Sequence, residues 1–181
     1  MQSDGVILVT QGDVRVSDCS ETIFMTLLGS CVSACMFDPV AGVGGMNHFL
    51  LPSGEGYATG DRISYGAHAM EVLINALINI GARKSRIKCK LFGGANIRLS
   101  FGNIGTQNSE FALEFLRDEG IDCVSSSTGG TFGRRVRFWP VGGRAQQAVI
   151  QDDTMPATEI RAAREDALRI RMDRQHEADF F

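Results

Sequence analysis

LGSCVSACMFDPVAGVGGMNHFLL, residues 28–51, contains two apolar runs separated by a segment rich in glycine. The runs, 31–37 and 45–51, have the composition of β-strands. Asp38-Pro39 is typical of the start of a turn, and the glycines that follow let the chain reverse direction. The stretch therefore predicts an antiparallel β-hairpin.

The hairpin raises a question of register, because its first strand begins with Cys31 and its second contains His48. In a strand, Cys31, Ser33, Cys35 and Phe37 lie on one face. His48 shares that face if it lies directly opposite Cys31 or one diagonal step away. A register one residue off sends the imidazole to the other face. A site made of thiol and imidazole thus depends on the register.

The rest of the chain alternates short apolar runs with two helical patterns. Residues 64–80 show apolar side chains at helical spacing, ending before Gly81, and residues 109–118 form a second helix with Asn108 or Ser109 as N-cap. Hairpin-sized turns favour antiparallel pairing. We expect a mixed, largely antiparallel α/β sandwich flanked by helices. Its predicted strands are residues 6–10, 22–28, 31–37, 45–51, 87–92, 121–125, 136–139 and 148–150.

The charge and hydropathy of the chain argue against nucleic acid and membrane as partners. The chain of 181 residues has 18 basic and 21 acidic side chains, a net charge of -3, so it has no basic field for nucleic acid. No run approaches the length of a membrane span, and the N-terminus lacks the basic region of a signal peptide. We expect a cytoplasmic protein without membrane insertion.

The five cysteines are Cys19, Cys31, Cys35, Cys89 and Cys123, an odd number without CxxC pairs. Disulfides and a zinc site are therefore not expected. Free cysteines are usually buried, and we interpret all of them except Cys31 as core residues.

The composition changes after Pro156, where Ala, Arg and acidic residues replace glycine. We predict a domain of residues 1–156 and a charged helical appendage of residues 157–181. The appendage is either a partner-binding helix or a solvated terminus.

Cys31 and His48 together have the minimum chemistry for acyl transfer. An imidazolium stabilises a thiolate, and the thiolate attacks carbonyl carbon. Gly29 and Ser30 let the backbone turn so that amide N–H groups face an oxyanion. The alternative from the residues alone is a core histidine beside a core cysteine.

The same stretch resembles the signature of the chemoreceptor glutamine deamidase family, CheD: an LGSC segment, Asp-Pro, a glycine turn, and GGMxHxxLP. The resemblance continues in Lys90 to Ala95 (KLFGGA), in the Asn103-Ile104-Gly105 entry to a helix with Asn108, and in Thr128-Gly129-Gly130 followed by Arg134-Arg135. It spans residues 6–149.

The resemblance implies a fold related to bacterial toxin deamidases and a Cys-His-Thr site. Cys31 is then the nucleophile, His48 the base, and Thr26 the third member, with Thr22 as the fallback. No metal or organic cofactor is needed.

The implied substrate is a glutamine on the cytoplasmic helical region of a chemoreceptor, which fits a shallow groove. Gly93, Gly94 and Ala95 are small enough for a partner backbone to approach. The family also implies a possible regulatory partner, a chemotaxis phosphatase similar to CheC.

Three other functions remain open. One is a generic cysteine amidase or peptidase, although the later histidines are His68, on a polar helix face, and His176, in the tail. Another is a binding module with a vestigial site. The third is a thiol redox sensor, for which Cys35 is the only neighbouring cysteine.

Overall fold

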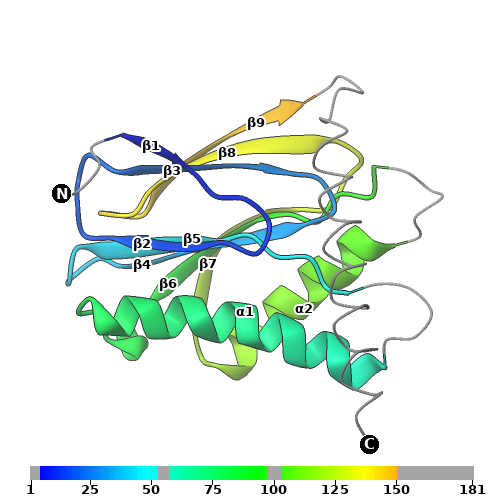
Figure 1. The fold of residues 1–181 in the computed structure, drawn as a ribbon, viewed down its shortest axis with the longest axis horizontal. Helices are drawn as coiled ribbons and strands as arrows, with labels where there is room; N and C mark the ends of the chain where they lie inside the picture. Colours follow the sequence, from blue (N-terminus) through cyan, green and yellow to red (C-terminus); the bar gives the residue numbers. More distant parts are fainter. Residues whose placement is uncertain (1–4, 53–57, 98–102, 151–181) are drawn as a thin grey trace, which may run out of the picture. The chain divides into compact units, whose positions relative to one another are not determined.

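The computed structural model describes residues 5–52, 58–97 and 103–150. Two β-sheets pack face to face, and the helices cover the outer face of one of them (Figure 1). The predicted α/β sandwich is confirmed. The predicted domain boundary at residue 156 and the appendage 157–181 lie outside the described residues.

The upper sheet in Figure 1 has four strands in the order β1-β3-β8-β9. Their pairing is antiparallel except between β1 and β3, which are parallel. In β3 every second residue is buried, namely Phe24, Thr26 and Leu28. Thr26 is thus a polar residue in an otherwise apolar inward row. The strands are β1 (Val6–Leu8), β3 (Ile23–Leu28), β8 (Gly133–Trp139) and β9 (Arg144–Ile150).

The second sheet has five strands in the order β2-β5-β4-β6-β7. The central strand β4 is buried along its whole length because the other sheet covers one face and helices cover the other. Strand β2 is missing from the sequence-based assignment because VRVS is short and carries a charge. The strands are β2 (Val14–Ser17), β4 (Val32–Asp38), β5 (Val43–Asn47), β6 (Lys88–Gly93) and β7 (Asp122–Thr128).

Helix α1 (Thr59–Asn79) joins β5 to the short 3-10 turn η1 (Lys84–Arg86), and α2 (Ile104–Asp118) joins β6 to β7. Both helices begin earlier than predicted. The predicted N-cap of α2 is wrong: Asn103 has that position, and Asn108 and Ser109 lie inside the helix, buried. Their hydrogen bonds to neighbouring residues explain why polar side chains are tolerated there.

The apolar side chains form two cores, one on each face of the five-stranded sheet. Val32, Met36 and Phe49 belong to the core under the helices. Cys35 and Met46 belong to the core between the sheets. Alternate residues of β4 therefore enter different cores, as the period-2 geometry of a strand requires.

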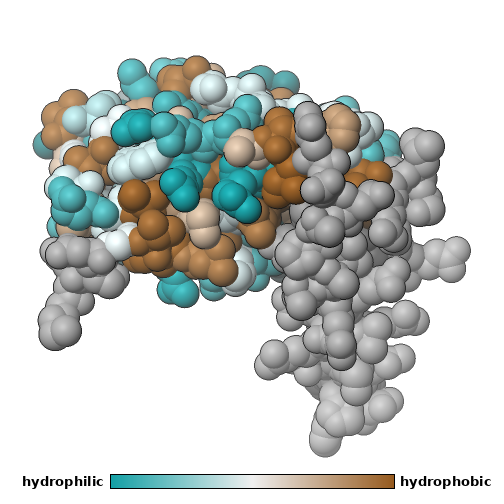
Figure 2. Space-filling view, turned by 90° about the horizontal axis from the view of Figure 1, so that it is seen from above, coloured by the Kyte–Doolittle hydropathy of each residue, from teal (hydrophilic) through white to brown (hydrophobic). Residues whose placement is uncertain are grey.

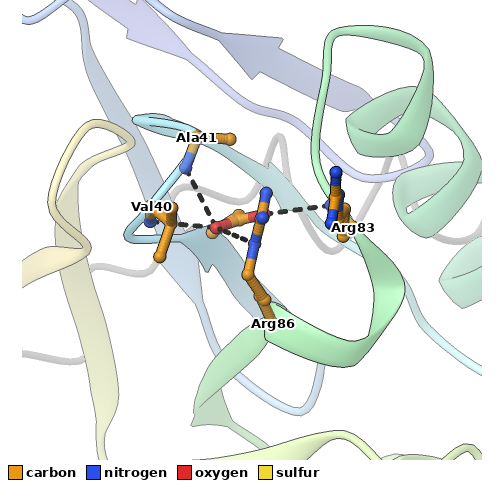
Figure 3. Close-up of polar contacts among 5 residues, drawn as sticks. Val40, Ala41, Arg83 and Arg86 are labelled. Atoms are coloured by element: carbon orange, nitrogen blue, oxygen red, sulfur yellow. Dashed lines mark hydrogen bonds and ion pairs between the residues drawn. The ribbon is translucent and has the colours of Figure 1, made fainter.

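A cluster of polar contacts anchors the turn between β4 and β5 (Figure 3). Its centre is Asp38, whose side chain is buried. It accepts hydrogen bonds from the amides of Val40 and Ala41, at 2.9 and 3.1 Å, as an Asx turn does. It also accepts from the Arg83 amide at 3.0 Å and pairs with the Arg86 guanidinium at 2.8 Å. The hairpin is thus tied to the segment that leads into β6.

The outer face of the four-stranded sheet, seen from above, mixes hydrophobic and hydrophilic residues (Figure 2). Val6 and Leu8 are about half exposed, at 54% and 51%. Strand β9 is largely exposed. This sheet therefore buries mainly its inner face, the face that carries Thr26. Within the described ranges, no helix has the length and apolar character that crossing a membrane requires.

Candidate active site

The register of the β4–β5 hairpin brings Cys31 and His48 to one face. Cys35 pairs with Met46, and Val32 forms an isolated bridge with Phe49. Continuing this register places His48 one diagonal step from Cys31 on the same side of the sheet. The one-residue slip that would separate them does not occur.

That face looks toward the other sheet. Cys35 and Met46, which share it, lie in the core between the sheets, and Cys31 is partly buried against this core. His48 is only 3% exposed. The two side chains therefore meet the inner face of the four-stranded sheet.

Thr26 reaches His48 from that facing sheet. Its hydroxyl Oγ1 donates to the carbonyl of Val9 at 2.7 Å and lies 2.9 Å from His48 Nδ1. Because the hydroxyl proton is used on Val9, Oγ1 must accept from Nδ1, which places the ring proton on Nδ1. The other ring nitrogen, Nε2, is buried and has no hydrogen-bond partner among the described residues. His48 is thus held in the tautomer whose Nε2 is able to take a proton.

Thr22, the fallback from sequence, is also buried in this region of the chain. Its hydroxyl accepts a hydrogen bond from Ser17 at 3.1 Å. Only Thr26 of the two has a hydrogen bond to His48. Alternation puts both threonines on the inward side, so the sequence leaves this choice open, and the hydrogen bonds of the folded chain resolve it.

Burial lowers the pKa of His48 to about 4, against smaller opposing effects from the Val9 carbonyl and the charge of Asp13. The neutral ring is therefore favoured at neutral pH. This differs from the imidazolium beside a thiolate that the residues suggest when the sequence is taken alone. The buried site instead favours the neutral imidazole, the form that can accept a proton.

The backbone that carries Cys31 is fixed by three consecutive carbonyls. The carbonyl of Gly29 accepts from the Ala95 amide at 2.9 Å, and that of Cys31 accepts from the Gly94 amide at 2.7 Å. Between them, the Ser30 carbonyl accepts from Asn108 Nδ2 at 2.8 Å. In a planar trans peptide the N–H points opposite to the C=O. The N–H groups of Ser30 and Cys31 therefore point away from Ala95 and Asn108.

The glycines expected to admit a partner backbone instead admit the chain itself. Gly93 and Gly94 have φ of 107° and 63°, a region that favours glycine. A side chain at Gly93 would meet the carbonyl of Cys31, and one at Gly94 would meet Ser109. Both glycines are buried, as is Ala95. They hold the Cys31 segment in place, and their contact with substrate stays a prediction.

Two side chains near the site are missing from the sequence-based candidates. Gln11 accepts a hydrogen bond from the Cys31 thiol, with 3.6 Å between Sγ and Oε1. Asn108 bonds to Ser30 and also accepts from the amide of Leu51 at 3.0 Å. The sequence contains a signal for Asn108, because this residue belongs to the segment quoted for the family resemblance. It contains no such signal for Gln11, which lies in a polar turn.

A hollow of about 240 Å³ borders His48 near α1, and Cys31 is not among its lining residues. His68 lines it and is exposed, as predicted. Because the thiol does not reach this hollow, we do not place the reacting amide there.

The remaining cysteines differ in burial. Cys35 and Cys89 are buried, and burial raises the pKa of Cys35 to about 12, so neither is suited to act as a nucleophile. Cys19 is partly buried, and Cys123 is exposed. The prediction of a core position for Cys123 is wrong because β7 is an edge strand.

Comparison with known proteins gives consistent family matches. Residues 50–148 match the family model described as CheD chemotactic sensory transduction. Three similar proteins are each named probable chemoreceptor glutamine deamidase CheD. The first, from Agrobacterium fabrum, is 54% identical over 77% of this chain and 77% of its own. The second, from Rhizobium rhizogenes, is 56% identical over 77% of each chain. The third, from Caulobacter vibrioides, is 53% identical over 82% of this chain and 80% of its own.

Among solved structures, the chain is similar to a Neisseria meningitidis protein of the DUF152 family, with a TM-score of 0.45 and 14% identity. The match covers 70% of this chain and 64% of that one, just under two thirds of its length. At this distance the similarity supports no argument about activity.

Proposed function

Because this chain belongs to the CheD chemotaxis family, we propose that it hydrolyses the side-chain amide of glutamine residues on chemoreceptors to glutamate, with release of ammonia. Relatives named chemoreceptor glutamine deamidase support the conversion of receptor glutamine. In this proposal Cys31 is the nucleophile, His48 the acid and base, and Thr26 the residue that positions His48.

The observation that carries the proposal is the hydrogen bond between Thr26 and His48. At 2.9 Å it holds Nδ1, and it leaves Nε2 unpartnered among the described residues, on the face that also carries Cys31. Thiol acyl transfer needs this arrangement: a nucleophile, a base, and a residue that orients the base.

The reaction begins with His48 neutral. Its Nε2 takes the thiol proton of Cys31 as sulfur attacks the carboxamide carbon of the substrate. This forms a C–S bond and places negative charge on the carboxamide oxygen. The imidazolium then returns the proton to the amide nitrogen, the C–N bond breaks, and ammonia leaves a glutamyl thioester.

Hydrolysis of the thioester uses the same residues, with sulfur now as the leaving group. Neutral His48 removes a proton from water as the water oxygen attacks the thioester carbon. The C–S bond breaks, sulfur recovers the proton, and glutamate leaves the free enzyme.

The charge on the carboxamide oxygen needs hydrogen-bond donors in both steps. We assign this role to the N–H groups of Ser30 and Cys31, because the carbonyls on the other side of their peptide planes are held by Ala95 and Asn108. Gly29 provides the turn just before them.

The finer assignments follow from the proposed activity. The substrate is the helical cytoplasmic region of a receptor, so the enzyme works in the cytoplasm. A phosphatase similar to CheC is proposed as its regulatory partner. No described feature favours a peptidase, and a binding module with a vestigial site would not need the hydrogen bond that holds His48 on the face of Cys31.

The direct test is deamidation of a purified cytoplasmic receptor fragment by the full-length protein. Peptide mass spectrometry detects each glutamine converted to glutamate, and a coupled assay measures the ammonia. We expect conversion by the wild type and none above background by Cys31→Ala.

The matched control is Cys123→Ala, which removes an exposed thiol from an edge strand and should leave the rate unchanged. Equal conversion by wild type and Cys31→Ala, or none by either, would reject the proposal. Cleavage of the fragment backbone instead would indicate a peptidase.

A further inference from the structure

The turn between β1 and β2 brings the carboxamide of Gln11 to the thiol of Cys31. The thiol donates to Gln11 Oε1, with 3.6 Å between Sγ and oxygen. Both side chains are partly buried. A group that combines hydrogen-bond donors and an acceptor is therefore in contact with the sulfur that the proposed reaction uses.

Hydrogen bonds within the turn fix its shape. The Asp13 carboxylate accepts from the amide and the hydroxyl of Thr10, at 3.0 and 2.8 Å. The amide of Asp13 donates in return to the Thr10 carbonyl at 2.9 Å. Gly12, with φ of 88°, provides the backbone conformation that closes the turn.

The same turn is bonded to the backbone of the proposed base. The Gly12 amide donates to the His48 carbonyl at 2.8 Å, and the His48 amide donates to the Asp13 carbonyl at 3.2 Å. Just before the turn, the Val9 carbonyl accepts from Thr26. The backbone of the turn that carries Gln11 is therefore anchored to His48 and to Thr26.

The contact with the thiol uses only Oε1 of the Gln11 carboxamide. The same carboxamide also carries Nε2, which has two N–H donors. As Cys31 gives its proton to His48 and attacks, sulfur no longer donates to Oε1, and Oε1 faces the negative charge that develops on the substrate oxygen. The terminal torsion of glutamine is broad and roughly two-fold, so the group turns readily to present Nε2. At that moment the reacting carbon is bonded to sulfur, and its oxygen develops negative charge next to the same sulfur.

We propose that Gln11 is a catalytic residue whose Nε2 donates a hydrogen bond to the oxyanion of the tetrahedral intermediate, beside the N–H groups of Ser30 and Cys31. This role rests on the proposed deamidase function and adds a side-chain donor to it. A donor carried by an anchored turn, beside the position where charge develops, stabilises the transition state more than the bound substrate.

The test compares Gln11→Leu and Gln11→Glu with the wild type on the receptor fragment, measuring kcat and KM separately. Leu has similar bulk and no donor, and we expect kcat to fall about 100-fold with KM changed by less than about 3-fold. Circular dichroism melting verifies that both variants are folded.

Gln11→Glu gives a readout that packing alone would not change. Its carboxylate lacks the donor at neutral pH, so kcat should fall at least as far as in Gln11→Leu. Near the ordinary glutamate pKa of about 4.3 the acid becomes protonated and donates again. The activity of this variant relative to wild type should therefore rise as the pH is lowered toward about 5.

Gln146→Glu, which changes an exposed glutamine of β9, is the matched control and should keep the wild-type rate and pH profile. A folded Gln11→Leu variant with wild-type or higher kcat would overturn this role, and a higher value would mean that Gln11 shields the thiol. If Cys31→Ala abolishes the reaction in the same assay, such a result rejects the role of Gln11 alone. A wild-type protein that converts no glutamine rejects the proposed function and this role with it.

Discussion

Thr26 has an unusual position for a polar residue, fully buried in the inward row of β3 between Phe24 and Leu28. Burial of a hydroxyl is costly unless it is hydrogen-bonded. Here it donates to Val9 and accepts from His48, so both functions of the hydroxyl are used. Its stabilising role and its proposed orientation of the imidazole come from the same two bonds.

Thr26→Val keeps the shape of the side chain and removes the hydroxyl. We expect kcat on the receptor fragment to fall about 10- to 100-fold, because His48 loses the acceptor that holds its tautomer and ring orientation. Thr26→Ser should retain most of the activity. Steady-state kinetics provide the measurement.

Thr22→Val is the matched control for Thr26, since it removes a buried hydroxyl that bonds Ser17 rather than His48. It should change stability without a comparable loss of kcat. Equal losses in the two valine variants would argue against an orienting role for Thr26.

At the scale of elements, α2 holds the two ends of the β4–β5 hairpin through one side chain. Asn108 donates to the Ser30 carbonyl before β4 and accepts from the Leu51 amide after β5. The segments that carry Cys31 and His48 are therefore linked at a buried point, 0% exposed. The helix determines their spacing without contributing a reacting group.

Asn108→Asp keeps the acceptor for Leu51 and replaces the donor to Ser30 with an oxygen. We expect kcat to fall at least about 10-fold because the Cys31 backbone is displaced, and we expect a loss of roughly 1–3 kcal/mol in the free energy of unfolding. Kinetics and urea unfolding measure the two effects.

Ser109→Ala, whose hydroxyl donates to Gly105 within α2, is the control from the same helix. It should keep kcat close to the wild-type value. An Asn108→Asp protein with unchanged kcat would contradict the positioning role.

At the scale of the molecule, the site lies between two sheets and combines segments that are far apart in the sequence. Val9 and Gln11 come from the β1–β2 region, Thr26 from β3, and Cys31 and His48 from the hairpin. Packing of the sheets buries His48 and lowers its pKa to about 4. The free energy of unfolding and the protonation state of His48 are therefore linked.

This linkage predicts acid sensitivity. An unfolded histidine has a pKa of about 6.5, so between about pH 6.5 and 4 the unfolded state binds a proton that the folded state does not. The free energy of unfolding should fall with decreasing pH over this window, by up to about 1.4 kcal/mol per pH unit from this residue. Urea unfolding at several pH values measures the slope.

His48→Gln should remove this part of the slope. It should leave the decline below about pH 4 that protonation of carboxylates such as Asp38 produces. Burial alone would raise the pKa of Asp38, but hydrogen bonds from Arg86 and three backbone amides hold it well below its usual range. If the free energy of unfolding changed with pH equally in wild type and His48→Gln between pH 6.5 and 4, burial of His48 would not be the cause of the acid sensitivity.

Much of the fold follows from local sequence patterns. The hairpin, the turn at Asp38 and the apolar stripe of α1 are visible as alternation, turn residues and helical spacing. The missed features have a common cause. Strand β2 (VRVS) and the first turns of the two helices (TGDR in α1 and IGTQ in α2) contain few apolar residues, so their patterns are weak.

The sequence by itself determined that Cys31 and His48 belong to one hairpin and that a single residue of register would unite or separate them. Only the tertiary structure decided that they face the other sheet, that Thr26 rather than Thr22 meets the imidazole, and that Gln11 reaches the thiol. Periodicity reports which side of its own strand a residue occupies. The partner across an interface depends on how the two sheets are packed, which no local pattern encodes.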